Sequence, residues 1–306
     1  MKTNDLKFTA YCCRGLQALV FLFCLFVAEV GFAQNNSMET YTSMAAGYCQ
    51  DKLYDKAILY SDSSIAAGEY TDAYTWYVRG FIFKEAYKSG VSGADNYRDM
   101  AVESLLKCME ILAGSQTYNP EVVLKYLATT YYNDALVAAS ECIDSKATES
   151  DSYFDRYLVL MAVLNPENKN ESASAEYYMT KAQRLYALWI EDTCNQDLLK
   201  KCEESYYKAL DYEPGNCDCL YNLSITSYNR GLMLMKADAS KDNCKSDIGV
   251  TECFEKSFDI LQKTAQQCPD RTDVYHALIN VCKALGKQEE AAGYSRLLEE
   301  KSPSKN

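Results

Sequence analysis

Residues able to carry acid–base, nucleophilic or metal chemistry are few and scattered in this sequence. It contains a single histidine, His276, which excludes a metal site built on histidines and the ordinary histidine-dependent catalytic triad. Adjacent carboxylates such as Glu203 and Glu204 cannot act as a pair, because neighbouring residues of a helix point in different directions. The sequence contains neither a glycine-rich phosphate loop nor a Gly-x-Ser-x-Gly nucleophile elbow. It therefore predicts a protein that is not an enzyme and uses no cofactor.

Cysteine is abundant, and its distribution bears on both chemistry and compartment. Three of the fourteen cysteines lie in the first 33 residues, which leaves eleven in the rest of the chain. In an oxidising compartment an odd number leaves at least one thiol free or paired with another molecule. The pair Cys217-x-Cys219 lacks the two-residue spacer of zinc and redox motifs. We therefore expect disulfides or buried thiols in the cysteine-rich stretch 194–268, with a zinc site as the alternative, and the sequence leaves the pairing open.

The first 33 residues have the pattern of a secretory leader. A basic start is followed by an apolar run over 16–28 and by the small residues of 31–33, which a signal peptidase reads. The apolar run is short for a helix that crosses a bilayer, and no second long apolar run follows. We therefore expect 1–33 to be a cleaved signal peptide. The remainder, 34–306, is expected to be exported to the periplasm or the medium of a bacterium, with no stable membrane span.

The exported part of the chain is acidic. The leader holds three of the 31 basic and two of the 43 acidic residues, so 28 basic and 41 acidic residues remain and the net charge is −13. Proteins that bind nucleic acid need basic surface to displace counterions from the phosphates. The composition therefore argues against nucleic acid as a partner and favours solubility and basic partners.

Proline and glycine are scarce and the apolar residues recur mostly at every third or fourth position, which favours an all-α chain. Comparison of the chain with itself at a period of about 34 residues reveals a repeat. Large or apolar side chains occupy repeat positions 4, 7 and 11, and small ones occupy positions 8 and 20. In the first unit the large or apolar residues at positions 4, 7 and 11 are Tyr41, Met44 and Tyr48, and the small residues at positions 8 and 20 are Ala45 and Ala57. We therefore expect each unit to form two helices that cross closely at the small residues.

The stretch 209–216, Ala-Leu-Asp-Tyr-Glu-Pro-Gly-Asn, followed by Leu-Tyr-Asn-Leu at 220–223, resembles a repeat junction of the tetratricopeptide family. The resemblance covers nearly all of 34–306, and the chain is similar to exported tetratricopeptide proteins of Bacteroidota. It implies an all-α, right-handed superhelix of antiparallel helix pairs whose first helices line a concave groove, and a role in binding proteins or peptides. The lysine and asparagine arrangement of the family members that clamp a terminal carboxylate is not reproduced.

The pattern predicts about six helical hairpins with long connections between the two helices of the middle units. The apolar content of 134–143 and 232–235 favours helical extensions, whereas the polar stretches 165–174 and 237–249 favour mobile loops. In the third unit Phe154 occupies the position of the small residue. The six units are predicted at approximately 38–71, 73–115, 121–167, 175–216, 217–271 and 272–304.

Candidate binding residues follow from the resemblance, which implies that certain positions of each first helix face the groove. Aromatic side chains there would grip an extended segment, and the amides of Asn133 and Asn229 would hold its backbone. The candidate groove residues are Tyr74, Tyr77, Phe81, Lys84, Lys125, Tyr132, Asn133, Tyr186, Tyr221, Tyr228, Asn229 and Lys283.

The sequence therefore predicts a non-catalytic scaffold of the cell envelope that binds a peptide or protein in the concave face of a superhelix. Two alternatives stay open. One is a structural subunit of a larger envelope assembly, in which the end hairpins stack on a neighbour. The other is an accessory protein that handles carbohydrate, which the aromatic content favours but for which no paired carboxylates across a cleft are evident.

Overall fold

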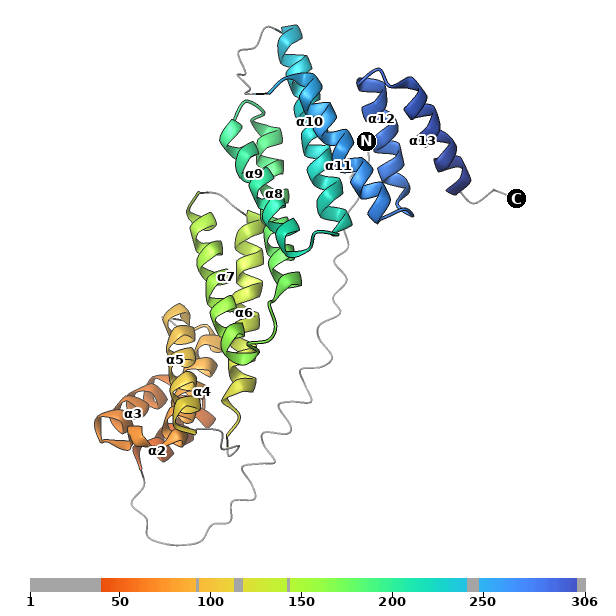
Figure 1. The fold of residues 1–306 in the computed structure, drawn as a ribbon. Coiled ribbons are helices and arrows are strands. Elements are labelled where there is room, and N and C mark those ends of the chain that lie inside the picture. Colours follow the sequence, from red (N-terminus) through yellow and green to blue (C-terminus); the bar gives the residue numbers. More distant parts are fainter. Residues whose placement is uncertain (1–39, 92–93, 113–117, 142–143, 241–247, 302–306) are drawn as a thin grey trace.

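The computed structural model describes residues 40–91, 94–112, 118–141, 144–240 and 248–301. Within these residues the chain forms twelve α-helices and a 3-10 turn, η1 (Glu69–Thr71), and no strand. Consecutive helices pair into antiparallel hairpins that stack one on the next (Figure 1). The six hairpins are α2 (Tyr41–Gln50) with α3 (Tyr54–Ala66), α4 (Ala73–Ser89) with α5 (Ala94–Leu112), α6 (Pro120–Glu141) with α7 (Asp144–Leu164), α8 (Glu171–Glu191) with α9 (Gln196–Tyr212), α10 (Cys217–Ser240) with α11 (Val250–Gln267), and α12 (Thr272–Ala284) with α13 (Gln288–Lys301).

The prediction of an all-α superhelix of about six hairpins is confirmed. The predicted signal peptide, residues 1–33, lies outside the described residues. Among the residues that are described, no helix combines the length and the apolar character needed to cross a bilayer.

Carboxylates at the starts of α2 and α4 fix where these helices begin. The side chain of Asp72 accepts a hydrogen bond from the backbone N–H of Tyr74 at 3.1 Å. The carboxylate of Glu69 accepts from the backbone N–H groups of Tyr41 and Thr42, each at 3.1 Å. Because the first N–H groups of a helix have no partner inside the helix, these bonds stabilise the helix starts and tie the first hairpin to the turn that follows it.

Small residues lie where the two helices of a hairpin cross. Ala45 and Ala57 are fully buried between α2 and α3. In the second hairpin a Cβ atom added to Gly80 would lie 2.5 Å from Cγ of Leu105, so glycine is the residue that fits without movement. The close crossing that the repeat pattern predicts is therefore present in these hairpins.

In the third hairpin the small residue Ser150 of α7 lies one turn before Phe154 and contacts α6. Ser150 is fully buried and its hydroxyl donates to the backbone carbonyl of Ala135 at 3.1 Å. The ring of Phe154 stacks on that of Tyr177 in the next hairpin, with the ring centroids 4.0 Å apart. Phe154 also shares a core cluster with Ala135 and Ala139 of α6, so this large side chain at the predicted small-residue position packs against its own hairpin and against the next one.

The extra residues of the middle hairpins lengthen their helices. Helices α6, α8 and α10 contain 22, 21 and 24 residues, whereas α2 and α12 contain 10 and 13. The predicted helical extensions are present over 134–141 and 232–235. Of the polar stretches predicted as loops, 165–170 connects α7 to α8 and 248–249 precedes α11. The loop prediction is wrong for 171–174, which begins α8, and for 237–240, which belongs to α10, while 241–247 lies outside the described residues.

The first helices of successive hairpins, α2, α4, α6, α8, α10 and α12, contact one another along the stack. The hydroxyls of Thr42 and Thr75 lie 3.0 Å apart between α2 and α4, and the amide of Asn229 in α10 donates to the hydroxyl of Tyr186 in α8 at 2.5 Å. In a stack of helical hairpins, the side on which successive helices approach is the inner side of the curve. The first helices therefore form the inner wall, and the second helices lie outside it.

The fourth hairpin is displaced along the helix axis relative to the third. The hydroxyl of Tyr132, in the second half of α6, donates to the carboxylate of Glu176 near the start of α8 at 2.5 Å. On the other side Lys181 of α8 pairs with Asp151 of α7 at 2.6 Å. The start of α8 therefore lies beside the middle of α6.

Candidate functional site

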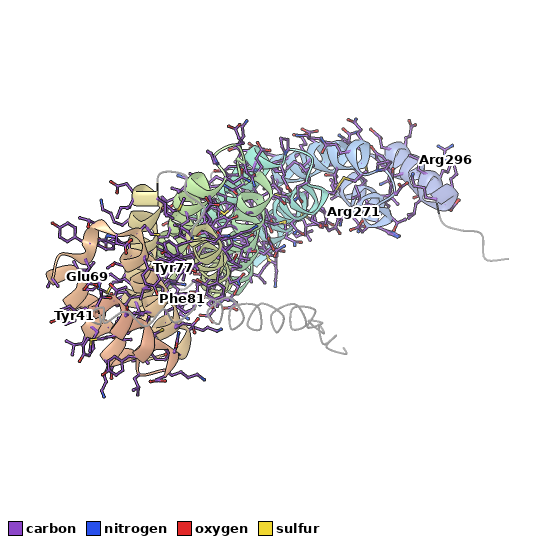
Figure 2. The ribbon with its side chains drawn as sticks, turned by 90° about the horizontal axis from the view of Figure 1, so that it is seen from below. Tyr41, Glu69, Tyr77, Phe81, Arg271 and Arg296 are labelled. Atoms are coloured by element: carbon purple, nitrogen blue, oxygen red, sulfur yellow. A yellow bond between two sulfur atoms is a disulfide. The ribbon has the colours of Figure 1, made fainter. Side chains whose placement is uncertain are left out.

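Tyr74, Tyr77 and Phe81 form a stripe along one side of α4. They are spaced at i, i+3 and i+7, which places them on one face of a helix, and each is half-buried. Figure 2 labels two of them, Tyr77 and Phe81. Tyr118, which precedes α6, adds its ring to the stripe, with its centroid 5.4 Å from those of both Tyr74 and Tyr77. The second and third hairpins thus share a continuous aromatic surface.

Lys84 extends the stripe by one more turn. Its Nζ atom lies 4.1 Å from the centroid of the Phe81 ring and 6.0 Å from that of Tyr126 in α6, and it forms an ion pair with Glu85. A cation over an aromatic face is attracted by the electron density of the ring, so these contacts hold the lysine on the aromatic surface. We name this set the tyrosine surface, and its members are Tyr74, Tyr77, Phe81, Lys84, Tyr118 and Tyr126.

Burial raises the pKa of the phenols of the tyrosine surface. The pKa values of Tyr74, Tyr77, Tyr118 and Tyr126 all lie above the ordinary value of 10.0, because removal from water disfavours the phenolate. These hydroxyls are therefore neutral at physiological pH and both donate and accept hydrogen bonds. The surface combines flat apolar rings, neutral hydroxyls and one ammonium group, a combination suited to binding rather than to covalent chemistry.

Three further candidate residues join neighbouring hairpins. Tyr132 donates to Glu176, and burial together with this hydrogen bond raises the pKa of its phenol. Asn229 donates to Tyr186, whose pKa is raised by burial. These side chains lie on the first helices, as the repeat pattern implies, but their polar groups are engaged within the array.

The remaining candidate residues lie in the third, fifth and sixth hairpins. The guanidinium of Arg271 lies 4.9 Å from the centroid of the Tyr221 ring, and the ring of Tyr228 lies 5.4 Å from that of Phe254. Four of the candidates therefore lie together on α4, and the others are spread along the first helices of the later hairpins. The candidates with mainly exposed side chains are Lys125, Asn133 and Lys283.

Sequence reasoning missed Tyr118 and Tyr126, both members of the tyrosine surface. The repeat position chosen on α6 was Lys125, whereas the member of the tyrosine surface is the next residue, Tyr126. Tyr118 lies outside any helix, so repeat positions say nothing of it. The one local signal is Pro120, because proline is favoured as the first residue of a helix and so fixes the chain just before it.

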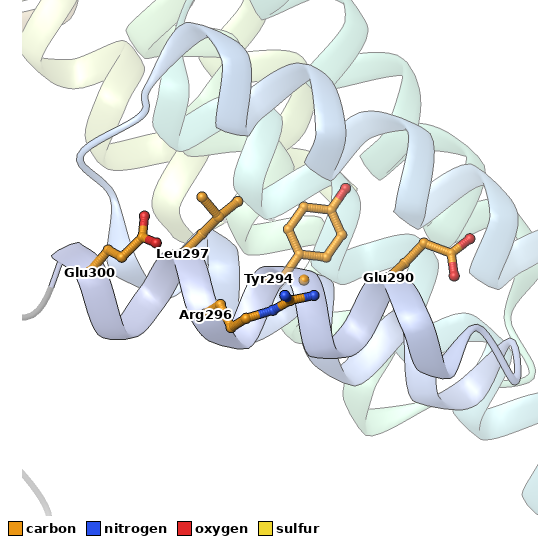
Figure 3. Close-up of a pocket in the computed structure, with 6 residues that line it drawn as sticks. Glu290, Tyr294, Arg296, Leu297 and Glu300 are labelled. Carbon is orange, nitrogen blue, oxygen red and sulfur yellow. The ribbon is translucent and has the colours of Figure 1, made fainter.

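A shallow hollow runs along the last helix (Figure 3), whose Arg296 lies at the other end of the array from Tyr77 and Phe81 (Figure 2). It is lined by Glu290, Tyr294, Arg296, Leu297 and Glu300, all from α13. Because one helix face provides the whole lining, the hollow is open to solvent and encloses nothing. It has none of the convergent polar groups of a small-molecule site.

Disulfides and buried thiols both occur in the stretch 194–268. Cys217, at the start of α10, is bonded to Cys268 at the end of α11, and Cys194 is disulfide-bonded as well. Cys202 and Cys219 are free and buried, and burial raises the pKa of each thiol to about 12. Over the ranges that the structure describes, no cluster of three or more histidine, cysteine, aspartate or glutamate residues has a metal-binding arrangement.

No model of a known protein family matches the chain, and no curated protein matches it by sequence. Among solved structures it is similar to PilW, a widely conserved type IV pilus biogenesis factor, with 16% identity over 87% of this chain and 94% of that one and a TM-score of 0.36. MamA of AMB-1 is 11% identical over 86% of this chain and 96% of that one, with a TM-score of 0.30. A monomeric mutant of IFIT1 with the capped RNA m7Gppp-AAAA is 11% identical over 94% of this chain and 55% of that one, with a TM-score of 0.37. These identities and TM-scores are too low to carry a conclusion about what this chain binds.

Proposed function

We propose that this chain is a non-catalytic scaffold of the cell envelope that binds an extended segment of a partner protein on the inner wall of its superhelix. The tyrosine surface is the central part of the proposed site. The chain reaches the envelope through the leader, residues 1–33, which is removed after Ala33.

The observation that carries the proposal is the concentration of half-buried aromatic rings on the inner wall between α4 and α6. Tyrosine and phenylalanine supply large contact areas at a low cost in side-chain entropy, and aromatic residues are enriched at the centres of protein interfaces. The phenol hydroxyls are neutral at physiological pH, and burial, which raises their pKa, keeps them so, which leaves them able to donate and accept hydrogen bonds with the backbone of a bound segment. Lys84 lies over the Phe81 ring and is already paired with Glu85, so the rings and hydroxyls, and not a free charge, form the contact with the bound segment.

The disulfides support an oxidising compartment. The bond between Cys217 and Cys268, together with the disulfide of Cys194, is typical of proteins outside the cytosol. The predicted leader points to the same compartment.

The experiment that tests the proposal is partner recovery from the envelope. Tagged chain 34–306 is crosslinked in its native host and copurified proteins are identified, for the unaltered chain and for the variant Tyr74→Ala/Tyr77→Ala/Phe81→Ala. Truncation of central aromatic residues commonly costs an interface about 2 kcal/mol or more, which is about a thirtyfold loss of affinity. We expect one reproducible partner that the triple variant fails to recover while its helical circular dichroism is unchanged.

The matched control is Tyr70→Ala, because this tyrosine is 53% exposed but belongs to the η1 turn and not to the inner wall. The control variant should recover the partner as well as the unaltered chain does. A partner that is retained by the triple variant, or recovery of no partner at all, would contradict the proposal.

A further inference from the structure

The second helix of a hairpin carries two residues that the next hairpin covers, four and seven places after the predicted small-residue position. In four hairpins both are at most 2% exposed, and these pairs are Ser61 with Ser64, Leu105 with Cys108, Tyr206 with Ala209, and Leu261 with Thr264. In the third hairpin the same two places hold Leu158 and Met161, which are only half-buried. Ser295 and Leu298, in the last hairpin of the described array, are half-buried as well. The fourth hairpin therefore leaves part of the third uncovered.

The packing of the helices explains this difference. In the other hairpins that have a successor, the second helix packs along the first helix of the next hairpin, as α3 does on α4, α5 on α6, α9 on α10 and α11 on α12. Over the residues that the structure describes, α7 does not run along α8 in this way, and α8 packs on α6 instead. In Figure 1 the fourth hairpin accordingly lies offset along the axis of the third. The two hairpins thus meet over part of their length.

The contacts across this junction gather around the stacked rings of Phe154 in α7 and Tyr177 in α8. The hydroxyl of Tyr177 donates to Asp151 at 2.6 Å, and Asp151 also pairs with Lys181 at 2.6 Å. Tyr132 of α6 lies against the same cluster of rings. The α8 residues in these contacts belong to its first half, whereas its second half packs on α9 and α10. The third and fourth hairpins are therefore joined at one place.

Polar links at the neighbouring junctions add to continuous helix packing. The ion pair of Arg98 with Asp134 joins the second hairpin to the third, where α5 also packs along α6. The ion pair of Lys256 in α11 with Glu203 in α9, at 2.8 Å, joins the fifth hairpin to the fourth, where α9 packs along α10. The ion pair and hydrogen bonds around the rings of the third and fourth hairpins lack such packing beside them. This junction is thus the place where the array is joined over the shortest length of helix.

We propose that the array bends at the junction of the third and fourth hairpins, so that hairpins one to three and four to six move as two bodies. A contact of limited extent between two units permits relative motion, whereas a large apolar one holds them together. The rings of Phe154 and Tyr177 form the pivot. The connection 165–170, which contains no helix, absorbs the change in backbone angles.

The bend separates two parts of the inner wall. The tyrosine surface moves with the first body, and Tyr186 with its partner Asn229 moves with the second. Bending therefore changes how the two parts of the wall are aligned. It is a property of the free chain and does not rest on the proposed function.

Distance distributions between pairs of spin labels, measured by pulsed electron paramagnetic resonance on chain 34–306, test the proposal. The labels are attached to a ketone-bearing amino acid, because the chain has free thiols of its own. Each pair joins exposed positions on the second helices of hairpins two apart, and the pairs are Leu59 with Val159, Val159 with Lys263, and Lys201 with Ala292. The pair Val159 with Lys263 spans the pivot, and the other two do not.

The pair that spans the pivot should give the broadest distribution. A rotation of about 15° moves a point about 20 Å from the pivot by about 5 Å. We therefore expect the distribution for Val159 with Lys263 to be about 5 Å broader than those of the other two pairs. Equal widths for the three pairs in the unaltered chain would overturn the proposal.

The variant Phe154→Leu removes the stacked ring but keeps an apolar side chain. It should broaden the distribution for Val159 with Lys263 further and leave the other two pairs as they are. The matched control is Phe254→Leu, because Phe254 is 2% exposed, as Phe154 is, but belongs to the fifth hairpin, and it should change none of the three.

Circular dichroism of both variants checks that the helices are intact. A Phe154→Leu variant that broadens no pair, or all three equally, would contradict the assignment of the pivot. The outcome is separate from partner recovery, so an array that does not bend would leave the scaffold proposal standing.

Discussion

The guanidinium of Arg98 in α5 lies 2.5 Å from a carboxylate oxygen of Asp134 in α6 and so joins the second hairpin to the third. Only 1% of the Arg98 side chain is exposed, against 43% of Asp134. The rings of Tyr87, Tyr131 and Tyr153 surround the guanidinium, and the centroid of Tyr131 lies 3.9 Å from it. A buried positive charge is therefore compensated by one carboxylate and three aromatic faces.

Removal of this carboxylate should destabilise the array more than removal of an exposed one. Asp134→Ala leaves the buried Arg98 without its counter-ion, and we expect a loss of about 2 kcal/mol in the free energy of unfolding. That is below the range of about 3–5 kcal/mol for fully buried pairs, because water reaches the Asp134 side of the pair. Glu110→Ala breaks the exposed pair with Lys107 and should cost less than about 1 kcal/mol. Equal urea midpoints for the two variants would contradict this account of Arg98.

Gly80 should resist substitution although alanine is the better helix former. A Cβ atom there would lie 2.5 Å from Cγ of Leu105 and 3.2 Å from the carbonyl oxygen of Ala101. We expect Gly80→Ala to lower the free energy of unfolding by about 1–3 kcal/mol, as overpacking does elsewhere. Gly293, in α13, has no atom within 4 Å of the added Cβ, so Gly293→Ala should raise stability by about 0.5–1 kcal/mol. Thermal unfolding of the two variants measures both effects, and a shift of the same sign in both would show that the crossing at Gly80 is not tight.

The hairpins were predictable because each depends on local spacing. Apolar side chains at repeat positions 4, 7 and 11, as in Leu124, Leu127 and Tyr131, mark the face that the preceding hairpin covers, and that periodicity is visible in the sequence. The stacking of Phe154 on Tyr177 was not predictable, because it is a contact between hairpins that local spacing does not encode.

The tyrosine surface was only partly predictable. The four candidates on α4 came from the repeat positions that the family resemblance implies face the groove, and helix geometry places residues at i, i+3 and i+7 on one face. Tyr118 could not be placed, because its position depends on the path of the chain between two hairpins. The hydrogen bond from Tyr132 to Glu176 depends on the axial displacement of the fourth hairpin, which no repeat position specifies. Contacts between units therefore determine which side chains of the inner wall remain available.

Loss of the disulfide between Cys217 and Cys268 should loosen the fifth hairpin and its junction with the sixth. The bond links residues 51 positions apart, and the entropy of closing such a loop corresponds to about 4 kcal/mol, with a general range of about 2–5 kcal/mol. Arg271 strengthens the same junction, because its guanidinium pairs with Asp218 of α10 at 2.6 Å. We expect Cys217→Ser/Cys268→Ser to lower the unfolding midpoint and to speed amide exchange in α10 and α12. Cys49→Ser, which removes a free thiol, should change neither by a comparable amount.

The buried thiols should make the protein less stable in alkali. Burial raises the pKa of Cys202 and of Cys219 from the ordinary value of 9.0 to about 12. Between these values the unfolded chain loses protons that the folded chain retains, so the free energy of unfolding falls as pH rises above about 9, by up to about 1.4 kcal/mol per pH unit for each thiol. Below pH 9 the thiols keep their protons in both the folded and the unfolded chain, so this loss of stability is absent there. Urea unfolding between pH 7 and pH 11 measures the slope, which should be shallower for Cys202→Ala than for the unaltered chain. A slope unchanged by this substitution would show that Cys202 does not resist ionisation in the folded state.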